Sequence, residues 1–153
     1  MIKPIYLDYN GTTPHDPEVV AAMRPFLEVE FGNPSSSHWY GIAPKQAVES
    51  ARKHVAGVLN CRPQELFFTS GGTEANNAAI LSAVWADPAK KHVISSQVEH
   101  ASVLTPLHFL RNLGYEIELL PVDGQGGLDL DRLAATIRPD TALVSLMGAN
   151  NET

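Results

Sequence analysis

The chain turns sharply at Thr69-Ser70-Gly71-Gly72-Thr73-Glu74-Ala75-Asn76-Asn77. The apolar run Glu65–Phe68 before it predicts a short buried strand, and Ala78–Trp85 after it predicts a helix. The first N–H groups of a helix lack an intrahelical partner and lie at the positive end of its dipole. Two glycines let the backbone approach an anion, and Thr73 adds a hydroxyl donor. This order of strand, turn and helix therefore predicts a phosphate site.

Two widespread phosphate loops do not match this turn. A Walker A loop needs a lysine after its last glycine, and the dinucleotide fingerprint needs a third glycine. Taken alone, Gly71 and Gly72 are equally compatible with a plain turn between a strand and a helix, because glycines are common there. The choice between the two depends on the rest of the chain.

Helical and strand patterns alternate along the sequence. Pro17 to Glu30 predicts a helix, with Asp16 as its N-cap and Pro25 as a residue that bends or shortens it. The remaining predicted helices are Lys45–Asn60, Ala101–Leu113 and Asp129–Ile137, and the predicted strands, typical of strands buried on both faces, are Leu66–Thr69, His92–Ser95, Glu116–Leu120 and Thr141–Met147. The alternation indicates an α/β fold with a doubly wound, mainly parallel sheet and flanking helices.

Polar motifs follow three of the four predicted strands. The Gly-Gly-Thr turn follows the first, Glu99-His100-Ala101-Ser102-Val103 the second, and Asn150-Asn151-Glu152-Thr153 the fourth. Ligands of such sheets bind at the carboxyl ends of the strands. The three motifs are therefore predicted to form one site from segments far apart in the sequence.

Five motifs, in order and spacing, resemble those of the cysteine desulfurases, which are pyridoxal-phosphate enzymes of aminotransferase class V. In that family they read roughly YLDYxATTP, FGNPSS, TSGxTExNN, EHxxV and NNExG. Here they begin at Tyr6, Phe31, Thr69, Glu99 and Asn150, so the resemblance extends over essentially the whole chain. One departure is Gly11, where the family usually has alanine.

The resemblance implies residue roles around pyridoxal 5'-phosphate. Gly72 and Thr73 would hold its phosphate, and His100 would stack on the pyridine ring and take part in proton transfer. Asn151 would hydrogen-bond the oxygen at C3 of the ring or the region of the substrate carboxylate. Without the resemblance, a histidine after a strand is more often a capping or surface residue, and Asn151 is an ordinary loop residue. Asn76 and Asn77 are expected to be satisfied polar groups of the helix.

The resemblance also implies that part of the site lies elsewhere. The family's Schiff-base lysine, in a Ser-x-His-Lys context, its ring-nitrogen aspartate and its nucleophilic cysteine all come after Asn-Asn-Glu. None of the lysines has that context, and Cys61 is expected to be a structural or partly exposed thiol. We expect residues 1–15 to form an N-terminal arm. Residues 16–153 would be the N-terminal part of the large cofactor domain of a fold-type I enzyme, inactive without the C-terminal remainder.

The implied activity is that of a cysteine desulfurase, which converts L-cysteine to L-alanine and leaves sulfur on the enzyme as a persulfide. The sulfur would pass to an acceptor protein for iron–sulfur clusters or thiolated RNA, and the complete enzyme would be a homodimer. A selenocysteine lyase, or another class V aminotransferase or lyase, is an alternative. A non-catalytic interaction fragment is another.

Composition narrows the possible partners. Hydrophobic residues make up 44% and charged residues 18% of the chain, which is typical of a globular protein. The net charge of -6 argues against a nucleic-acid surface, and no apolar run is long enough to span a membrane. We expect no metal site. The single cysteine and the lack of an apolar signal sequence favour the cytoplasm.

Overall fold

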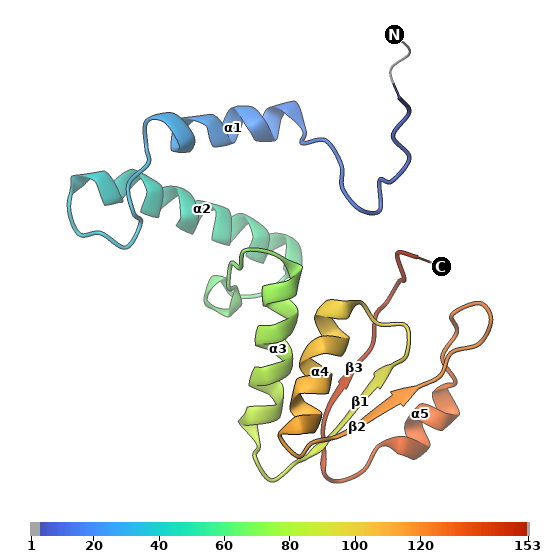
Figure 1. The fold of residues 1–153 in the computed structure, drawn as a ribbon. Helices are drawn as coiled ribbons and strands as arrows, with labels where there is room; N and C mark the ends of the chain where they lie inside the picture. The colour runs from blue at the N-terminus through green and yellow to red at the C-terminus, as the bar shows by residue number, and fades with distance from the viewer. Residues whose placement is uncertain (1–3, 153) are drawn as a thin grey trace. The chain divides into compact units, whose positions relative to one another are not determined.

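The computed structural model describes residues 4–152 and divides the chain into two units, Met1–Phe68 and Thr69–Thr153 (Figure 1). Residues 1–3 of the predicted arm and Thr153 of the last motif lie outside the described residues. We call the two parts the N-terminal unit and the C-terminal unit. The predicted division into an arm of residues 1–15 and a domain of residues 16–153 stays a prediction.

The C-terminal unit is built on a parallel sheet of three strands in the order β2-β1-β3. These are β1 (His92–Ser96), β2 (Glu116–Leu120) and β3 (Thr141–Ser145). All five residues of β1 are buried, whereas β2 and β3 are partly exposed. The prediction that these strands are buried on both faces is therefore correct only for β1, which is the central strand of the sheet formed by the described residues.

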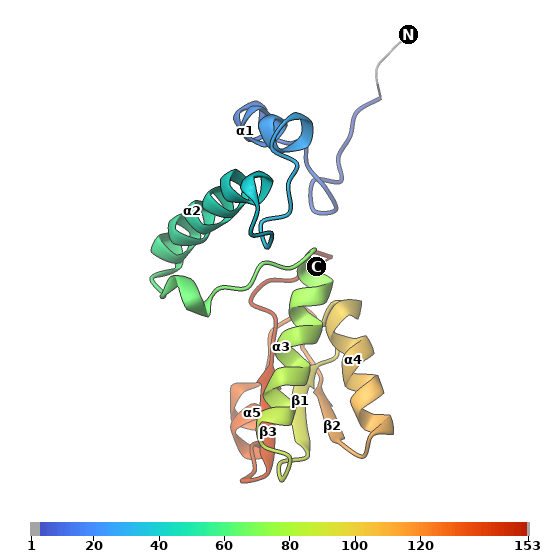
Figure 2. The same ribbon diagram turned by 90° about the vertical axis from the view of Figure 1, so that its left-hand side faces the viewer.

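Helices cover both faces of this sheet. The connection from β1 to β2 runs through α4 (Ala101–Asn112), and the connection from β2 to β3 returns past β1 through α5 (Leu130–Thr136). Because parallel crossovers are right-handed, these opposite directions place α4 and α5 on opposite faces, as Figure 2 shows. The preceding helix α3 (Gly72–Ala86) packs against α4 and β3. The prediction of a doubly wound parallel sheet is thus confirmed.

The core of the C-terminal unit lies between the sheet and the pair α3 and α4. Val84 of α3, Val93 of β1 and Leu107 and Leu110 of α4 are fully buried there. Burying such side chains contributes about 1.5–3 kcal/mol each to stability. The Tyr115 hydroxyl also donates to the Val84 carbonyl at 3.3 Å, which joins the end of α3 to the start of β2. This packing holds α3 and α4, whose N-terminal ends carry two of the predicted motifs, against the sheet.

The N-terminal unit consists of α1 (Pro17–Glu28), the short 3-10 helices η1 (Trp39–Gly41) and η2 (Pro63–Glu65), and α2 (Ile42–Leu59). Asp16 caps α1 as predicted, since its Oδ1 accepts from the Glu18 N–H at 2.7 Å. Pro25 lies inside α1, which continues for three more residues to Glu28. Asn60 ends α2 in the left-handed conformation, with φ 53°.

Glycines in the N-terminal unit have contrasting surroundings. A Cβ added at Gly32 would lie 1.9 Å from the Tyr40 carbonyl oxygen, and one at Gly41 would lie 2.4 Å from the Ser36 carbonyl oxygen. Only glycine allows these backbone segments to approach so closely. A Cβ at Gly57, in α2, would meet nothing within 4 Å.

The predicted strand Leu66–Thr69 is wrong. Residues 66–69 have no strand assignment, and Phe67 and Phe68 are 83% and 51% exposed. An apolar run becomes a strand only when its backbone N–H and C=O groups find a neighbouring ladder, and residues 4–152 provide none here. Instead, Arg52 of α2 donates to the Leu66 carbonyl and lies 4.9 Å from the centre of the Phe68 ring.

Candidate functional site

The turn before α3 has the geometry of an anion site. The first intrahelical bond after the turn runs from the Ala75 N–H to the Gly71 carbonyl at 3.1 Å, so the N–H groups of Gly72 and Thr73 precede the helical ladder. A Cβ added at Gly71 or at Gly72 would meet nothing within 4 Å. The turn therefore offers open space beside backbone donors at the positive end of a helix dipole.

Glu74 holds this turn in shape. Its Oε2 accepts from the Ser70 hydroxyl at 2.6 Å and from the Ser70 N–H at 2.7 Å. These two hydrogen bonds, with the hydroxyl contributing more, lower the pKa of Glu74 below its ordinary value. The carboxylate is thus a structural group of the first turn of α3.

His100 lies at the N-cap of α4, after the carboxyl end of β1. Its Nδ1 accepts from the Ser102 N–H at 3.0 Å and lies 2.8 Å from the Ser102 Oγ. The capping role anticipated for a histidine after a strand is therefore confirmed. Capping uses only Nδ1, and the side chain is exposed, so it does not conflict with the predicted role toward a cofactor ring.

Asn76 connects this histidine to the glycine turn. The Asn76 Nδ2 donates to the Ser102 Oγ at 2.8 Å, which joins α3 to α4. Asn77 instead donates back to the Thr73 carbonyl within α3 at 2.8 Å. The expectation that both are satisfied polar groups of the helix is confirmed, and Asn76 finds its partner on α4 because the close packing of α3 on α4 brings it to the Ser102 hydroxyl.

Glu99 and Asn150 join the loop after β1 to the loop after β3. The buried Glu99 carboxylate accepts from the Ser96 hydroxyl at 3.0 Å and from the Met147 N–H at 2.7 Å. In the opposite direction, the Asn150 Nδ2 donates to the Val98 carbonyl at 3.0 Å. Asn151 is the exposed neighbour of Asn150 in the second loop.

Sequence reasoning missed the positioning contacts of Glu99, Ser102 and Asn150. Each lies within a quoted motif, but a polar residue in a motif does not show whether it points to a ligand or to a neighbouring loop. One signal was available for Glu99: an acidic residue three positions after a buried strand is costly to bury unless it is hydrogen-bonded. The carboxyl edge of the sheet thus brings together three of the predicted motifs through residues that were not predicted as site residues.

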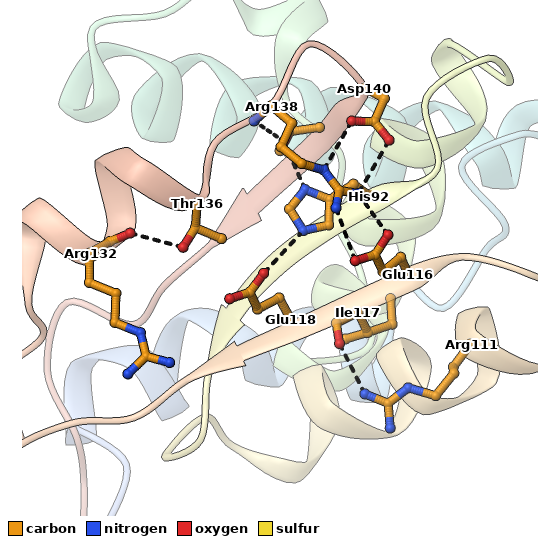
Figure 3. A network of polar contacts seen from close by, with 10 residues as sticks. His92, Arg111, Glu116, Ile117, Glu118, Arg132, Thr136, Arg138 and Asp140 are labelled. Carbon is orange, nitrogen blue, oxygen red and sulfur yellow. Dashed lines mark hydrogen bonds and ion pairs between the residues drawn. The ribbon is translucent and has the colours of Figure 1, made fainter.

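A second polar network lies at the opposite edge, where the strands begin (Figure 3). Arg138 donates to both carboxylate oxygens of Glu116 at 2.9 and 2.8 Å and to Asp140 Oδ1 at 3.1 Å. His92 is fully buried beside it. Its Nδ1 lies 2.9 Å from the Thr141 Oγ1 and its Nε2 3.7 Å from the Glu118 Oε2. This network ties the starts of all three strands together and is separate from the candidate site.

Neither a metal site nor a membrane-spanning helix is found among residues 4–152. These residues contain no group of three or more histidine, cysteine, aspartate or glutamate side chains placed to hold a metal ion. Cys61 is a free, partly exposed thiol, which is one of the two forms expected for it. Within the described part of the chain, every helix is too short or too polar to cross a bilayer.

Known proteins with similar sequences and structures identify the family. Residues 5–153 match the aminotransferase class-V family. The chain is 50% identical to the cysteine desulfurase IscS of Dictyoglomus turgidum, with alignment to 99% of this chain and 39% of that protein. It is 51% identical to cysteine desulfurase 2 of Trichormus variabilis, over 97% of this chain and 37% of the relative. The chain therefore spans about two fifths of the length of these curated relatives.

Solved structures agree with this assignment. A NifS-like protein superposes with a TM-score of 0.92 at 38% identity, over 97% of this chain and 41% of that one. A structure described as SspA in complex with cysteine superposes with a TM-score of 0.88 at 33% identity, over 96% of this chain and 43% of that one. Because nearly all of its residues match this family, the chain belongs to the aminotransferase class-V family.

Proposed function

We propose that this chain provides the N-terminal part of the pyridoxal-phosphate site of a cysteine desulfurase. The reaction converts L-cysteine to L-alanine and leaves the sulfur on the enzyme as a persulfide. One observation carries the proposal: the Gly-Gly-Thr turn, the His100 loop and the Asn151 loop are joined at one edge of the sheet by the bonds of Asn76, Glu99 and Asn150. The names of the relatives, cysteine desulfurases at about 50% identity, support the same activity.

The residues at this edge fit the proposed cofactor. The N–H groups of Gly72 and Thr73 and the Thr73 hydroxyl suit a phosphate dianion, and the space beside the glycines is open. The flat ring of His100 suits stacking on a pyridine ring, and the Asn151 amide suits a hydrogen bond to the ring oxygen at C3 or to the substrate carboxylate region. When bound, the cofactor supplies an electron sink for the amino-acid substrate.

The proposal assigns the missing groups to the C-terminal remainder of the enzyme. The lysine that holds the cofactor and the cysteine that receives the sulfur lie there, and a sulfur-acceptor protein takes the persulfide sulfur. A homodimer is supported by the apolar side chains that the N-terminal unit leaves exposed, among them Met23, Phe26 and Phe31. A cytoplasmic location stays a prediction, and one relative is named as a mitochondrial enzyme.

The activity is tested on the complete enzyme loaded with pyridoxal phosphate. We expect L-cysteine to yield alanine and protein persulfide in equal amounts, measured by chromatography and by thiol-specific labelling. His100→Ala should lose most of this activity, whereas Ser82→Ala, an exposed change on α3, should not. Alanine formation from L-selenocysteine but not from L-cysteine would contradict the proposal in favour of a selenocysteine lyase.

Thr73 provides a separate prediction about the cofactor. Thr73→Val keeps the shape of the side chain but removes the hydroxyl donor. A hydrogen bond to a charged group is worth about 1.5–3 kcal/mol. Cofactor affinity should therefore fall roughly 10- to 150-fold, at about 1.4 kcal/mol per tenfold. Equilibrium titration of the complete enzyme measures the change, and unchanged affinity would restrict Thr73 to a role in the first turn of α3.

A further inference from the structure

The Nδ1 of His100 contacts two groups of Ser102, its backbone N–H and its hydroxyl. A backbone N–H can only donate, and the Ser102 N–H points at the His100 Nδ1 at 3.0 Å. This nitrogen must therefore offer its lone pair and carry no proton. In a neutral imidazole the proton then resides on Nε2.

The Ser102 hydroxyl strengthens the same arrangement. Its oxygen accepts from the Asn76 Nδ2 at 2.8 Å and lies 2.8 Å from the His100 Nδ1. If Nδ1 is unprotonated, as the Ser102 N–H requires, the hydroxyl proton of Ser102 is the donor of this second contact to the histidine. Ser102 is buried and Asn76 is partly buried, so water competes little with this series of bonds.

We propose that Ser102 is a positioning residue that, with Asn76, fixes His100 as the neutral tautomer with its proton on Nε2. The Nε2 of His100 is then a hydrogen-bond donor and not a base. To accept a proton at Nε2 from the neutral form, the ring would have to carry its first proton on Nδ1, and it would lose the bond from the Ser102 N–H. The link between the tautomer and catalysis rests on the proposed function, but the tautomer itself does not.

The tautomer is measured by two-bond ¹H–¹⁵N spectroscopy of the full chain, labelled with ¹⁵N at histidine and without cofactor. His100→Gln assigns the signal. At a pH where the ring is neutral, we expect His100 to show a protonated Nε2 and an unprotonated Nδ1. A protonated Nδ1, or a nearly equal mixture of the two tautomers, would overturn the proposal. Because the tautomer is measured in the unmutated chain, the result does not depend on whether a variant folds.

Variants test the part played by the hydroxyl. Ser102→Ala keeps the backbone donor and should reduce the ratio of the two tautomers about fivefold, which corresponds to about 1 kcal/mol. Ser102→Thr restores the hydroxyl and should restore the ratio, and Ser82→Ala is the matched control on an exposed site of α3. An unchanged ratio in Ser102→Ala would refute the role of the hydroxyl.

The two proposals fail in different ways. If the complete enzyme does not release alanine from L-cysteine while His100 shows the Nε2–H tautomer, only the proposed function fails. If the enzyme is active but Ser102→Ala changes neither the tautomer nor kcat, only the positioning role fails. We expect Ser102→Ala to lower kcat and to leave KM nearly unchanged, because Ser102 acts through His100 and not on the substrate.

Discussion

His100 has two roles, and each uses a different part of its ring. Nδ1 caps α4 through Ser102, and the exposed remainder of the ring is left for the cofactor. Sequence patterns present each task as an alternative to the other, since a capping histidine and a ligand-binding histidine look the same in a sequence. Only the folded structure shows that one nitrogen is sufficient for the cap.

This division leads to a prediction for two substitutions of His100 in the complete enzyme. His100→Phe keeps a flat ring and should retain cofactor affinity, but it removes the Nε2–H donor, so its turnover should fall about 10²–10³-fold, the usual cost of removing one hydrogen-bond donor to the transition state. His100→Ala should lose affinity as well. Cofactor titration and steady-state kinetics measure the two effects.

A control is needed because both variants remove the cap of α4. Thermal unfolding of each variant, followed by circular dichroism, reports the cost to the helix, which we expect to be about 1 kcal/mol in both. Near-normal turnover of the Phe variant would limit His100 to stacking. Normal affinity and normal turnover in the Ala variant would exclude it from the site.

At the scale of elements, each strand that was predicted correctly has a parallel partner within the C-terminal unit. β2 begins and ends at the predicted residues, and β1 differs by one residue at its end. Leu66–Thr69 has an equally apolar pattern, yet Phe67 is exposed. The pattern records how apolar a segment is, whereas a strand also needs a backbone partner, which local sequence does not specify. The convergence of the motifs was predictable because topology follows from the order of the elements. The bonds of Asn76 and Glu99 were not predictable, because side-chain pairing depends on packing.

Gly57 provides a prediction about α2. Glycine in a helix costs roughly 0.5–1 kcal/mol relative to alanine, and a Cβ at this position meets open space. Gly57→Ala should therefore raise the free energy of unfolding by that amount, measured by urea denaturation. Gly32→Ala is the matched opposite case, because its Cβ would overlap the Tyr40 carbonyl oxygen, and it should destabilise the protein. A destabilised Gly57→Ala variant would show that the helix surface at this position is in contact with another part of the protein.

At the scale of the whole molecule, the network around Arg138 makes the stability of the folded state depend on pH. The hydrogen bonds from Arg138 lower the pKa of Glu116 below its ordinary value. A carboxylate with a lowered pKa in the folded state stabilises the protein above its unfolded pKa, and this contribution is lost as the pH falls through the folded value. The strand starts are thus predicted to weaken below about pH 5.

Arg138→Met tests this link. The variant should be less stable than the wild type near neutral pH, and its unfolding free energy should change less between neutral and acidic pH. Urea denaturation at a series of pH values measures both. Arg24→Met removes the exposed pair with Glu28, at 3.9 Å, and should change neither quantity. An unaltered pH dependence in Arg138→Met would remove Glu116 from the groups that govern acid stability.

The hydrogen bond from the Met147 N–H to Glu99 also affects the rate of hydrogen exchange. An amide outside a strand usually exchanges its hydrogen for deuterium quickly, but the Met147 N–H is held by a buried carboxylate. Its exchange should be slow, and Glu99→Ala should accelerate it roughly 10- to 150-fold, as expected for a hydrogen bond worth about 1.5–3 kcal/mol. The amide of Gln125, bonded to Asp123 in an exposed turn, should keep its rate. The lifetime of this one hydrogen would then record how long the loops that carry His100 and Asn151 stay joined.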